Sequence, residues 1–498
     1  MTELTHEHTE VLVVGAGPGG LTTAITLARA GIDTLVVERH PGTSPFPKAT
    51  GVSTRTMELM RAWGLEERVR AGGMRVQPTV TVSDTLTAPA RLTSPTVFPT
   101  DDEARTVSPT TPCFCAQDHL EPILLEHLRA QGGRVRFGTE LTALSTDRMT
   151  GVTAELRQRG SGRRTLLRAE YVVGADGPRS TVRAALGIGV EELGTLGEFV
   201  GVTFRAELTD RMPRLPSVVN VVETPGAAGL LVPTSADGRW IYARAGAELP
   251  ADPVELLRAA TGVPELRPHV LTVMPFTMAA HVAWALRSRD GRGFLVGDAA
   301  HRTTAMGGIG MNTAMHAGHN LGWKLAWALR GHADDALLDS YQAERLPVGR
   351  ANAQRSLLTD APDYDALAID LGVRYPSGER APHAWVRHHR LRRSTLDLFD
   401  GRLTVLAGHD GGHWRAAARA LGAEGLPISG LAVDRDLNPL DGTFEERYRL
   451  GPSGAVLVRP DGYLAARLDT STATATDALR TAVDHAIGRH PVALTQAS

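Results

Sequence analysis

The first strong hydrophobic pattern in the chain covers residues 11–38. Four consecutive apolar residues, 11–14, are typical of a strand that is buried on both faces of a sheet. A glycine-rich turn and a helical segment over residues 21–30 follow, and a second apolar run over residues 34–37 ends in Glu38. The pattern therefore predicts a βαβ unit, and the rest of the chain is organised around it.

The remaining pattern changes several times between helical and strand periodicity. Helices are predicted at residues 54–63, 313–330, 335–350, 414–420 and 474–488, and two more begin at Gln117, with Asp118 as N-cap, and at Thr181. Strands are predicted at residues 135–137, 141–145, 152–157, 166–173, 200–207, 218–223, 229–233, 239–244, 292–297, 403–406, 455–458 and 463–467. Residues 72–112 indicate short strands and loops, and Pro376, Pro382 and the basic residues at 387–393 indicate a linker.

The length of 498 residues is enough for about three domains. The predicted fold class is α/β and α+β, with a Rossmann-like nucleotide-binding domain, an inserted antiparallel-sheet domain that binds substrate, and a small C-terminal α/β domain. The expected boundaries are 1–75, 113–185 and 285–385 for the first domain, 76–112 and 186–284 for the second, and 386–498 for the third.

The glycine-rich turn has the residues that a dinucleotide pyrophosphate requires. Gly15 permits a tight turn, Gly17 lets the backbone approach the phosphates, and Gly20 lets the helix pack close to its strand. The free N–H groups and dipole of the helix N-terminus stabilise a bound anion by up to about 2 kcal/mol. Glu38 is placed to accept hydrogen bonds from an adenosine ribose and disfavours a 2′-phosphate, so FAD or NAD fits better than NADP.

Composition limits the possible partners. The net charge of −2 provides no basic surface for nucleic acid. No run of 18 apolar residues occurs and the first ten residues lack a signal-peptide pattern, so we expect a soluble, cytoplasmic protein with no membrane partner. Cys113 and Cys115 have neither the usual spacing of a redox pair nor further metal ligands, and we expect buried structural thiols and no metal site.

Two further acidic turns follow later strands. Asp176-Gly177 ends an apolar strand and precedes a helix, which places backbone donors at the end of a sheet. Gly297-Asp298 ends the short strand that starts at Arg292, and a glycine-rich loop, residues 302–312, then opens the helix at 313–330. Both turns are candidates for contact with the same cofactor.

The three motifs, in this order and context, resemble those of the flavoprotein aromatic hydroxylases of the para-hydroxybenzoate hydroxylase fold. The resemblance covers the whole chain, and segments 399–406 and 457–463 point to the phenol hydroxylase and aromatic polyketide hydroxylase subgroup. In that subgroup the C-terminal domain is thioredoxin-like but has lost its redox cysteines, and this segment has no cysteine.

The resemblance implies an FAD site. It assigns the ADP half of FAD to Gly15, Gly17, Pro18, Gly19, Gly20, Glu38, Arg39 and Gln117, and the flavin pyrimidine edge to the backbone of Gly308, Gly310, Met311 and Asn312. Asp298 would hydrogen-bond the ribitol or lie beside the pyrophosphate, and Asp176 with Arg179 would lie where NAD(P)H meets the FAD-binding domain. A helix N-terminus at the pyrimidine edge would stabilise negative charge on the reduced flavin.

Two departures from the family pattern concern this site. The family often has Pro-Pro where this chain has residues 303–306, which leaves the stiffness of the loop open. It commonly has arginine at the position of Lys48, and lysine replaces a bidentate phosphate clamp with a point charge. FAD binding is still expected, with Lys48 among the contacts.

The implied activity is an FAD-dependent monooxygenase that uses NAD(P)H and O₂ to hydroxylate an aromatic substrate, a polycyclic polyketide-type phenol, through a flavin C4a-hydroperoxide. Only one dinucleotide fingerprint is complete, so NAD(P)H would dock transiently, and the apolar face of the middle sheet would keep the site dry. No catalytic residue is assigned. His281, His316 and His319 are candidates for a base, although packing is the commoner role of two histidines three residues apart on a helix.

Other activities remain open on the same motifs. A Baeyer–Villiger or epoxidising monooxygenase would share the reacting species. An FAD-dependent reductase or dehydrogenase is disfavoured because the chain has no second nucleotide fingerprint and no flavin-adjacent cysteine pair. A non-catalytic flavoprotein is disfavoured because the motifs at all three flavin positions are intact, and a halogenase because the chain has no WxWxIP-like segment. The chain could be a monomer or a homodimer.

Overall fold

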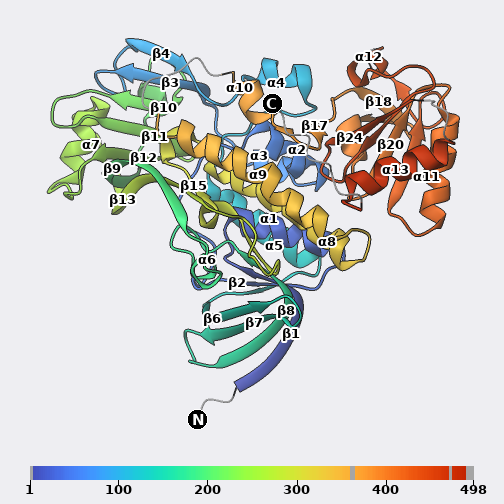
Figure 1. Cartoon of the computed structure of the whole chain (residues 1–498). Helices are drawn as coiled ribbons and strands as arrows, with labels where there is room; N and C mark the ends of the chain where they lie inside the picture. The colour runs from blue at the N-terminus through green and yellow to red at the C-terminus, as the bar shows by residue number, and fades with distance from the viewer. Residues whose placement is uncertain (1–3, 359–364, 443, 470–473, 490–498) are drawn as a thin grey trace.

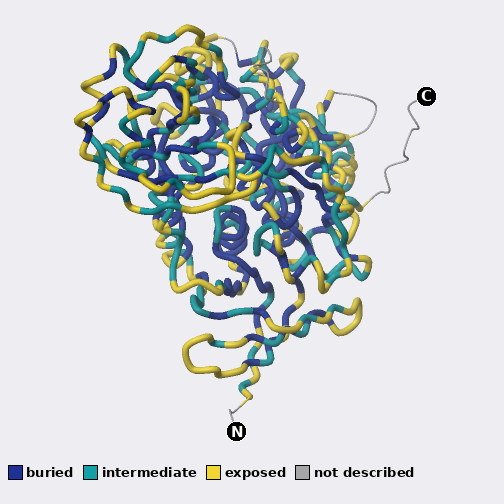
Figure 2. Tube along the Cα trace, turned by 90° about the vertical axis from the view of Figure 1, so that its left-hand side faces the viewer, coloured by how far each residue is buried: buried dark blue, intermediate teal, exposed yellow. Residues whose placement is uncertain are grey.

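The computed structural model describes residues 4–358, 365–442, 444–469 and 474–489. They form three units with long helices between them (Figure 1). A mostly parallel sheet lies at the lower end with the N-terminal strand, an antiparallel sheet lies on the left, and a small α/β unit lies on the right. Buried segments concentrate in the centre of the molecule, whereas rim loops are exposed (Figure 2).

The first sheet has the strand order β5-β2-β1-β8-β7-β6, with β14 added beside β8. Its strands are β1 (Leu4–Val14), β2 (Thr34–Val37), β5 (Arg134–Arg136), β6 (Thr139–Asp147), β7 (Gly151–Gln158), β8 (Arg164–Gly174) and β14 (Gly293–Leu295). β1 pairs in parallel with both β2 and β8, while β7 pairs antiparallel with β6 and β8. The predicted βαβ unit is therefore present at the core of this sheet.

Helices α1 (Pro18–Arg29) and α8 (Gly310–Leu329) pack closely because their contact uses small residues. A Cβ atom at Gly318 would lie 2.6 Å from the carbonyl oxygen of Gly19, and one at Gly322 would lie 2.6 Å from Cβ of Thr26. α5 (Gln117–Ala130) packs on α1, and α9 (Asp335–Arg355) packs on α8. The early turns of α1 and α8 therefore lie side by side.

The second sheet has eight strands in the order β15-β13-β9-β12-β11-β10-β3-β4. Its strands are β3 (Gln77–Ser83), β4 (Leu92–Pro95), β9 (Val190–Arg205), β10 (Ser217–Val222), β11 (Gly229–Ser235), β12 (Arg239–Ala245), β13 (His269–Ala283) and β15 (His301–Arg302). Helix α7 (Pro253–Thr261) contributes Leu257 to a core with Phe204, Trp240 and Tyr242 from one face of this sheet.

The opposite face of the second sheet is apolar and faces the first unit. Ile241 on β12 pairs with Val232 on β11, and Leu230 pairs with Val221 on β10, so the four side chains share this face. All four are partly exposed. Arg239, on the same face of β12, forms an ion pair of 2.6 Å with Asp118 of α5. This face of the sheet is therefore the one turned toward the first unit.

The C-terminal unit contains a four-stranded sheet in the order β21-β20-β23-β24. It is built from β20 (Leu403–Ala407), β21 (Ile428–Ala432), β23 (Ala455–Val458) and β24 (Leu464–Leu468), with α11 (Gly412–Ala423), α12 (Phe444–Tyr448) and α13 (Ala475–Ala486). β20 is parallel to β21 and antiparallel to β23, as in a thioredoxin-like sheet. A smaller sheet of β18 (Trp385–His388), β19 (Leu391–Ser394) and β22 (Asn438–Pro439) lies beside it.

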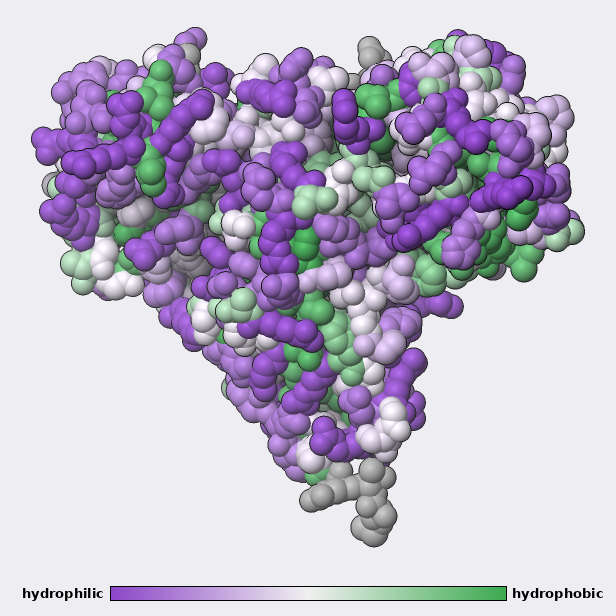
Figure 3. Space-filling model, turned by 180° about the vertical axis from the view of Figure 1, so that it is seen from behind, coloured by the Kyte–Doolittle hydropathy of each residue, from purple (hydrophilic) through white to green (hydrophobic). Residues whose placement is uncertain are grey.

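The remaining described elements are short. They are α2 (Thr54–Ala62), α3 (Glu66–Arg70), α4 (Asp101–Val107), α6 (Thr181–Ala185), α10 (Ala366–Asp370), β16 (Arg374–Tyr375), β17 (Gly378–Glu379) and the 3₁₀ turns η1 (Thr209–Arg211), η2 (Gly297–Ala299), η3 (Ala305–Gly307) and η4 (Thr395–Leu398). Within the described residues no helix combines the length and apolar character needed to cross a membrane. The face seen from behind is mostly hydrophilic (Figure 3).

Some predicted elements were wrong. The expected linker at 376–393 contains a strand hairpin, β18 with β19, and the expected loops at 72–112 contain helix α4. α4 begins with a capping box between Thr100 and Glu103, a sequence signal that the polar composition of the segment obscured. Asp118 is not an N-cap: α5 is capped at Ala116, and the Asp118 carboxylate instead pairs with Arg239.

Candidate active site

The turn between β1 and α1 contains glycines under different constraints. Gly15 has φ +110°, and a Cβ there would lie 2.2 Å from the carbonyl oxygen of Ala175. A Cβ at Gly20 would lie 2.1 Å from the carbonyl oxygen of Gly15. At Gly17 a Cβ would meet nothing within 4 Å, so the fold itself leaves open space there. That open space lies where a pyrophosphate would approach the backbone.

Two helix N-termini meet beside this turn. α1 begins after Gly17 and α8 begins after Ile309, and neither helix is capped by a described side chain. A Cβ at Gly19 would lie 3.3 Å from Cβ of Ala314, which brings the first turns of the two helices together. Two positive dipole ends with uncapped N–H groups form a site suited to an anion.

Glu38 ends β2 and turns its carboxylate back to the glycine turn. One oxygen accepts a hydrogen bond of 2.9 Å from the Ala16 backbone N–H, and the other accepts one of 2.9 Å from the His40 N–H. The side chain is thereby held at the edge of the turn, where a ribose could reach it. Arg39, the next residue, is exposed.

A buried pair on α5 lies close to the same end of the sheet. The Gln117 side-chain amide donates to the Glu121 carboxylate at 2.6 Å, and the Ser44 backbone N–H donates to the other Glu121 oxygen at 2.8 Å. Burial raises the pKa of Glu121, while the positive charge of Lys48 acts against this rise. Gln117 and Lys48 were among the residues predicted from the sequence, whereas Glu121 was not, although its four-residue spacing from Gln117 was an available signal.

The Asp176-Gly177 turn also lies beside the glycine turn, because Ala175 contacts Gly15. The Asp176 carboxylate accepts hydrogen bonds from the Ser180 hydroxyl and, at 3.1 Å, from the Val182 backbone N–H. It therefore closes its own turn and holds the start of α6.

Asp298 lies in η2, directly after β14, with an exposed side chain at a place otherwise enclosed by protein. The loss of hydration raises the pKa of this carboxyl, against the positive charges of Arg302 and Lys48. The Asp298 carbonyl oxygen accepts a hydrogen bond of 3.1 Å from His281 Nε2, which holds the turn against β13. A carboxylate exposed at this point can accept hydrogen bonds from a hydroxyl-bearing ligand.

The glycine-rich loop before α8 is anchored although it lacks the family's prolines. The Thr304 backbone N–H donates to the Ser356 hydroxyl at 2.9 Å, and the Thr304 hydroxyl donates to the Ser356 carbonyl oxygen. Gly308 has φ +61°, and a Cβ at Gly310 would lie 2.4 Å from the Thr303 hydroxyl oxygen. Hydrogen bonds to the end of α9 thus replace proline as the source of rigidity.

Asn312 is fully buried and its side chain does not point to an open site. Its Oδ1 accepts hydrogen bonds from the Ser53 backbone N–H at 2.9 Å and the Thr56 hydroxyl at 2.8 Å. Its Nδ2 donates to the Gly51 carbonyl oxygen at 2.9 Å. Asn312 therefore ties the Gly51–Ser53 segment to the first turn of α8, and sequence reasoning missed both Ser53 and Thr56.

Phe98 connects this loop to a cavity of about 490 Å³. Its ring lies 2.4 Å from a Cβ position at Gly51 and 3.3 Å from one at Gly308. The cavity is lined by Phe98 with residues of β3, β4, α4 and α10. Phe98 also stacks edge-on with Phe114, in a cluster that includes Val219 from the apolar face of the second sheet.

Comparison with known proteins decides the family. Residues 8–356 match the family model described as FAD binding domain, and residues 375–490 match the one described as aromatic-ring hydroxylase, C-terminal. The chain belongs to the FAD-dependent aromatic-ring hydroxylases.

Curated relatives match this hydroxylase along nearly its full length. Aklavinone 12-hydroxylase RdmE of Streptomyces purpurascens is 39% identical, and the match covers 94% of this chain and 97% of the relative. Tetracenomycin B2 monooxygenase-dioxygenase of Streptomyces olivaceus is 36% identical, with 93% and 95% covered.

Solved structures agree with these relatives. A ternary complex of aklavinone-11 hydroxylase with FAD and aklavinone superposes with a TM-score of 0.88 at 36% identity, covering 98% of this chain and 100% of that one.

The residues of this hydroxylase fit FAD as its cofactor. Gly17 leaves the space that a pyrophosphate needs, two uncapped helix N-termini face that space, and Asp298 carries an exposed carboxylate beside it. Each feature is local to the fold and independent of the similarity to other proteins. The family assignment and the geometry therefore lead to the same cofactor.

The three candidate bases of the hydroxylase lie outside the Phe98 cavity. His281 donates to the Asp298 carbonyl oxygen, and His316 Nε2 lies 3.0 Å from the Thr56 hydroxyl. His319 contacts Trp63 on the side of α8 that faces the C-terminal unit. Burial lowers the pKa of all three imidazoles. Cys113 and Cys115 are buried free thiols, as expected from their spacing.

Proposed function

We propose that this FAD-dependent hydroxylase acts on a polycyclic phenol of the polyketide type. The observation that carries the proposal is the cavity of about 490 Å³ that Phe98 joins to the glycine-rich loop. Its volume is within the usual range of about 300–1,000 Å³ for ligand pockets. Relatives named for aklavinone and tetracenomycin, together with an aklavinone-bound structure, support a substrate of this class.

We propose the following contacts for FAD. The pyrophosphate lies over the β1–α1 turn, the adenosine ribose is bound by the Glu38 carboxylate, and Asp298 binds hydroxyl groups of the ribitol. The residues assigned to FAD are Gly15, Gly17, Pro18, Gly19, Gly20, Glu38, Arg39, Lys48, Gln117, Asp298, Gly308, Gly310, Met311 and Asn312. Asn312 contributes through its backbone, because its side chain is occupied by Gly51, Ser53 and Thr56.

When bound, FAD supplies the redox chemistry that activates O₂. The chain supplies the surroundings. The α8 N-terminus favours negative charge in front of the loop, and the apolar face with Val221, Leu230 and Ile241 keeps water away from the substrate side. Phe98 contributes to the lining of the cavity where it meets the loop.

The co-substrate and setting belong to the same proposal. The chain has one complete dinucleotide fingerprint, so NAD(P)H would bind transiently. We place it near Asp176, whose backbone lies beside the glycine turn, and near Arg179. We propose a cytoplasmic enzyme that is a monomer or a homodimer. The expected domain boundaries stay a prediction.

The test is a turnover experiment with ¹⁸O₂. Purified enzyme with FAD, NADPH or NADH, and a panel of polycyclic phenols should consume NAD(P)H faster in the presence of one compound and yield a product with one labelled hydroxyl oxygen. Label in a lactone or ester would instead assign Baeyer–Villiger chemistry to the same fold. NAD(P)H consumption that yields no labelled product with any member of the panel would refute the substrate class.

A further inference from the structure

A second cavity, of about 250 Å³, lies between α2, α8 and the C-terminal unit. It shares no lining residue with the Phe98 cavity. One side of α8 provides His316, His319, Trp323 and Trp327 to it at helical spacing. Its mouth lies near Arg29 and the exposed residues 400–402.

Aromatic rings form much of the cavity wall. They are Trp63, Trp323, Trp327, Tyr375, Phe399 and Tyr463, which include three of the seven tryptophans of the chain. Trp323 and Trp327 meet edge to face at 6.0 Å, and Tyr375 stacks on Tyr463 at 4.1 Å between ring centres. Such a wall offers both ring faces and ring edges to a planar guest.

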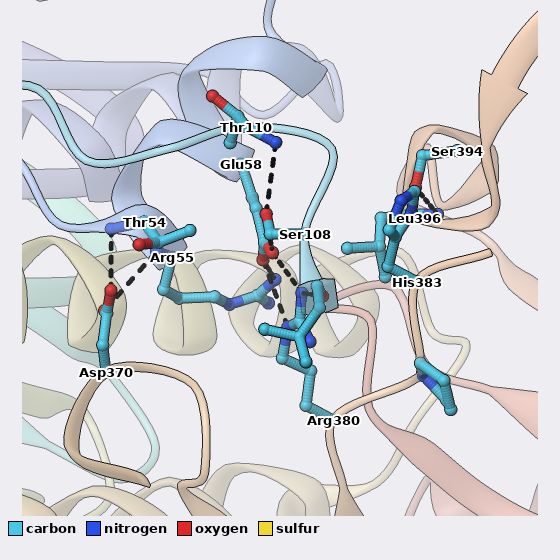
Figure 4. Close-up of polar contacts among 12 residues, drawn as sticks. Thr54, Arg55, Glu58, Ser108, Thr110, Asp370, Arg380, His383, Ser394 and Leu396 are labelled. Carbon is cyan, nitrogen blue, oxygen red and sulfur yellow. Dashed lines mark hydrogen bonds and ion pairs between the residues drawn. The ribbon is translucent and has the colours of Figure 1, made fainter. Parts of the chain in front are cut away.

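Two carboxylates of the cavity wall, Glu58 and Asp370, already have hydrogen-bonding partners. Glu58 on α2 binds Arg55, at 2.8 Å, and Arg380, and it also accepts a hydrogen bond from the Ser108 hydroxyl (Figure 4). Asp370 accepts hydrogen bonds from the backbone N–H groups of Thr54 and Arg55 at the start of α2 (Figure 4).

Two more carboxylates and one guanidinium belong to the interior wall of the cavity. Asp461 pairs with Arg459, and Asp397 pairs with Arg61. Arg345 donates to the Tyr375 hydroxyl and to the Thr313 carbonyl oxygen. Arg345, which has no acidic partner in the described chain, and Asp370, which is held by backbone donors, contribute one charge of each sign. The other charged lining residues, Arg29, Asp400 and Arg402, are exposed at the mouth. The interior wall therefore presents ion pairs and one charge of each sign to a guest, which favours an uncharged molecule.

Hydrogen-bonding capacity remains at the two histidines. His316 and His319 are only partly buried, which leaves part of each ring open to the cavity. His316 Nε2 is taken by the Thr56 hydroxyl, whereas His319 makes no hydrogen bond within the described residues. Burial lowers the pKa of His319 to about 4, so at neutral pH the ring is uncharged and carries one donor and one acceptor nitrogen.

We propose that this cavity is a second ligand site, which takes an uncharged planar molecule of one or two aromatic rings with a hydroxyl or N–H group for His319. The size sets the class: an apolar cavity of about 150 Å³ holds benzene, and pockets for larger ligands start at about 300 Å³. The polycyclic substrate proposed above needs a larger space, so this site is distinct from the proposed site of hydroxylation.

The site has a short connection to the cofactor loop. Thr56, which contacts His316, also donates to Asn312, and Asn312 holds the Gly51–Ser53 segment at the start of α8. Two hydrogen bonds, His316–Thr56 and Thr56–Asn312, therefore connect a guest against His316 with the residue that holds the Gly51–Ser53 segment.

The test uses oxidised holoenzyme without NAD(P)H, so that its result does not depend on turnover or on the substrate proposed above. 2-Naphthol is titrated by isothermal calorimetry into wild type, Ala62→Phe and Ala130→Phe. Ala62 and Ala130 are the exposed last residues of α2 and α5, and only Ala62 lines the cavity. We expect binding to wild type and Ala130→Phe, and a loss of at least about tenfold in affinity in Ala62→Phe because the added ring occupies the site.

A second variant covers the case in which Ala62→Phe does not fold. His319→Leu keeps a side chain of similar size but removes the hydrogen-bonding ring, so 2-naphthol should bind more weakly while naphthalene binds as in wild type. The proposal is overturned if wild type fails to bind 2-naphthol at about 1 mM, a free energy of only about −4 kcal/mol. It is also overturned if the cavity variants bind 2-naphthol as wild type does, because the probe then lies elsewhere.

Discussion

Gly15 and Gly17 lie two residues apart but are under different constraints. An added side chain should therefore have a different effect at each position. At Gly15, φ is +110° and a Cβ would lie 2.2 Å from the Ala175 carbonyl oxygen, so Gly15→Ala should destabilise the apoprotein by about 1–3 kcal/mol. At Gly17, a side chain meets no protein atom within 4 Å. Gly17→Val should leave apoprotein stability within about 0.5 kcal/mol of wild type but weaken FAD binding by about 100-fold.

Thermal unfolding of the apoprotein and quenching of FAD fluorescence separate the two effects. Gly15→Ala should lower the melting temperature before any cofactor is added, and Gly17→Val should change only the FAD titration. If Gly17→Val binds FAD as tightly as wild type, the pyrophosphate does not lie at this turn.

The buried amide of Asn312 takes part in three hydrogen bonds, so its removal should lower the stability of the protein. Asn312→Ala leaves the Ser53 N–H and the Gly51 carbonyl oxygen without a partner, at a cost of about 1–3 kcal/mol for each group. Thr56→Val removes a single contact to the same amide and should cost less. Urea unfolding of both variants checks the order, and equal losses would show that the amide does not hold the Gly51–Ser53 segment.

At the scale of elements, α2 connects the cofactor unit to the C-terminal unit through Glu58. Burial alone would raise the pKa of Glu58, but Arg380 and Arg55 hold it below its usual value (Figure 4). Arg380→Met removes one of the two guanidinium partners of this buried carboxylate. Because Arg55 remains, the variant should cost about 1–3 kcal/mol of unfolding free energy, less than a buried charge left unpaired. The control is Arg105→Met, whose ion pairs on α4 are exposed and should contribute less than about 1 kcal/mol.

Chemical denaturation at pH 7 and pH 3 gives the second readout. Because the pKa of Glu58 is lowered in the folded state, its contribution to stability is present above its unfolded pKa and is lost as the pH falls. The difference between wild type and Arg380→Met should therefore shrink on acidification. A difference that does not change with pH would mean that Arg380 acts through packing and not through the charge of Glu58.

An element could be predicted from the sequence when the interactions that form it lie within its own segment. β1, α1 and β2 were predictable because burial on both faces, a positive φ at Gly15 and the acid at Glu38 all leave marks in one short segment. β13 was not, since it is stabilised by pairing with the distant β9 and its exposed residues break the alternation. The hairpin of β18 and β19 was hidden by arginines, which are exposed on its surface.

The candidate site shows the same division. The glycines and Glu38 carry a local signature, so their place could be predicted from spacing alone. Phe98, Ser53 and Thr56 meet Gly308 or Asn312 only through the tertiary fold, with more than 200 residues between them in sequence. Such contacts leave no periodic signal in the segment that contains them, which explains why sequence reasoning missed them.

At the scale of the whole molecule, the three units leave two cavities with different chemistry. The Phe98 cavity lies between the antiparallel sheet and the glycine-rich loop, and the smaller one lies between α8 and the C-terminal unit. α8 is the element common to both regions, because its N-terminus follows the loop and its side carries the histidines and tryptophans. The glycines of α8 pack closely against α1, which holds α8 in place beside both cavity regions.

Buried histidines distributed over the units make the stability of the whole molecule sensitive to mild acid. Burial lowers the pKa of His301 to about 3 and that of His319 and His383 to about 4, from 6.5 for an ordinary histidine. Between pH 6.5 and pH 4 the unfolded chain therefore binds protons that the folded chain does not, and stability must fall as the pH falls through this window. Each such histidine adds a slope of up to about 1.4 kcal/mol per pH unit.

The carboxylates do not account for this loss. The lowered pKa values of Glu58 and Asp461 place the loss of their contribution below the histidine window, and the raised pKa values of Glu121, Asp298 and Asp370 act in the opposite direction. Urea midpoints measured at constant ionic strength from pH 7 to pH 4.5 should decline steadily. His301→Gln should reduce the slope of unfolding free energy against pH by up to about 1.4 kcal/mol per pH unit, which corresponds to one proton. Both ring nitrogens of His301 lack a partner among the described residues. A flat profile between pH 6.5 and pH 5 would show that these rings take up protons in the folded state without cost.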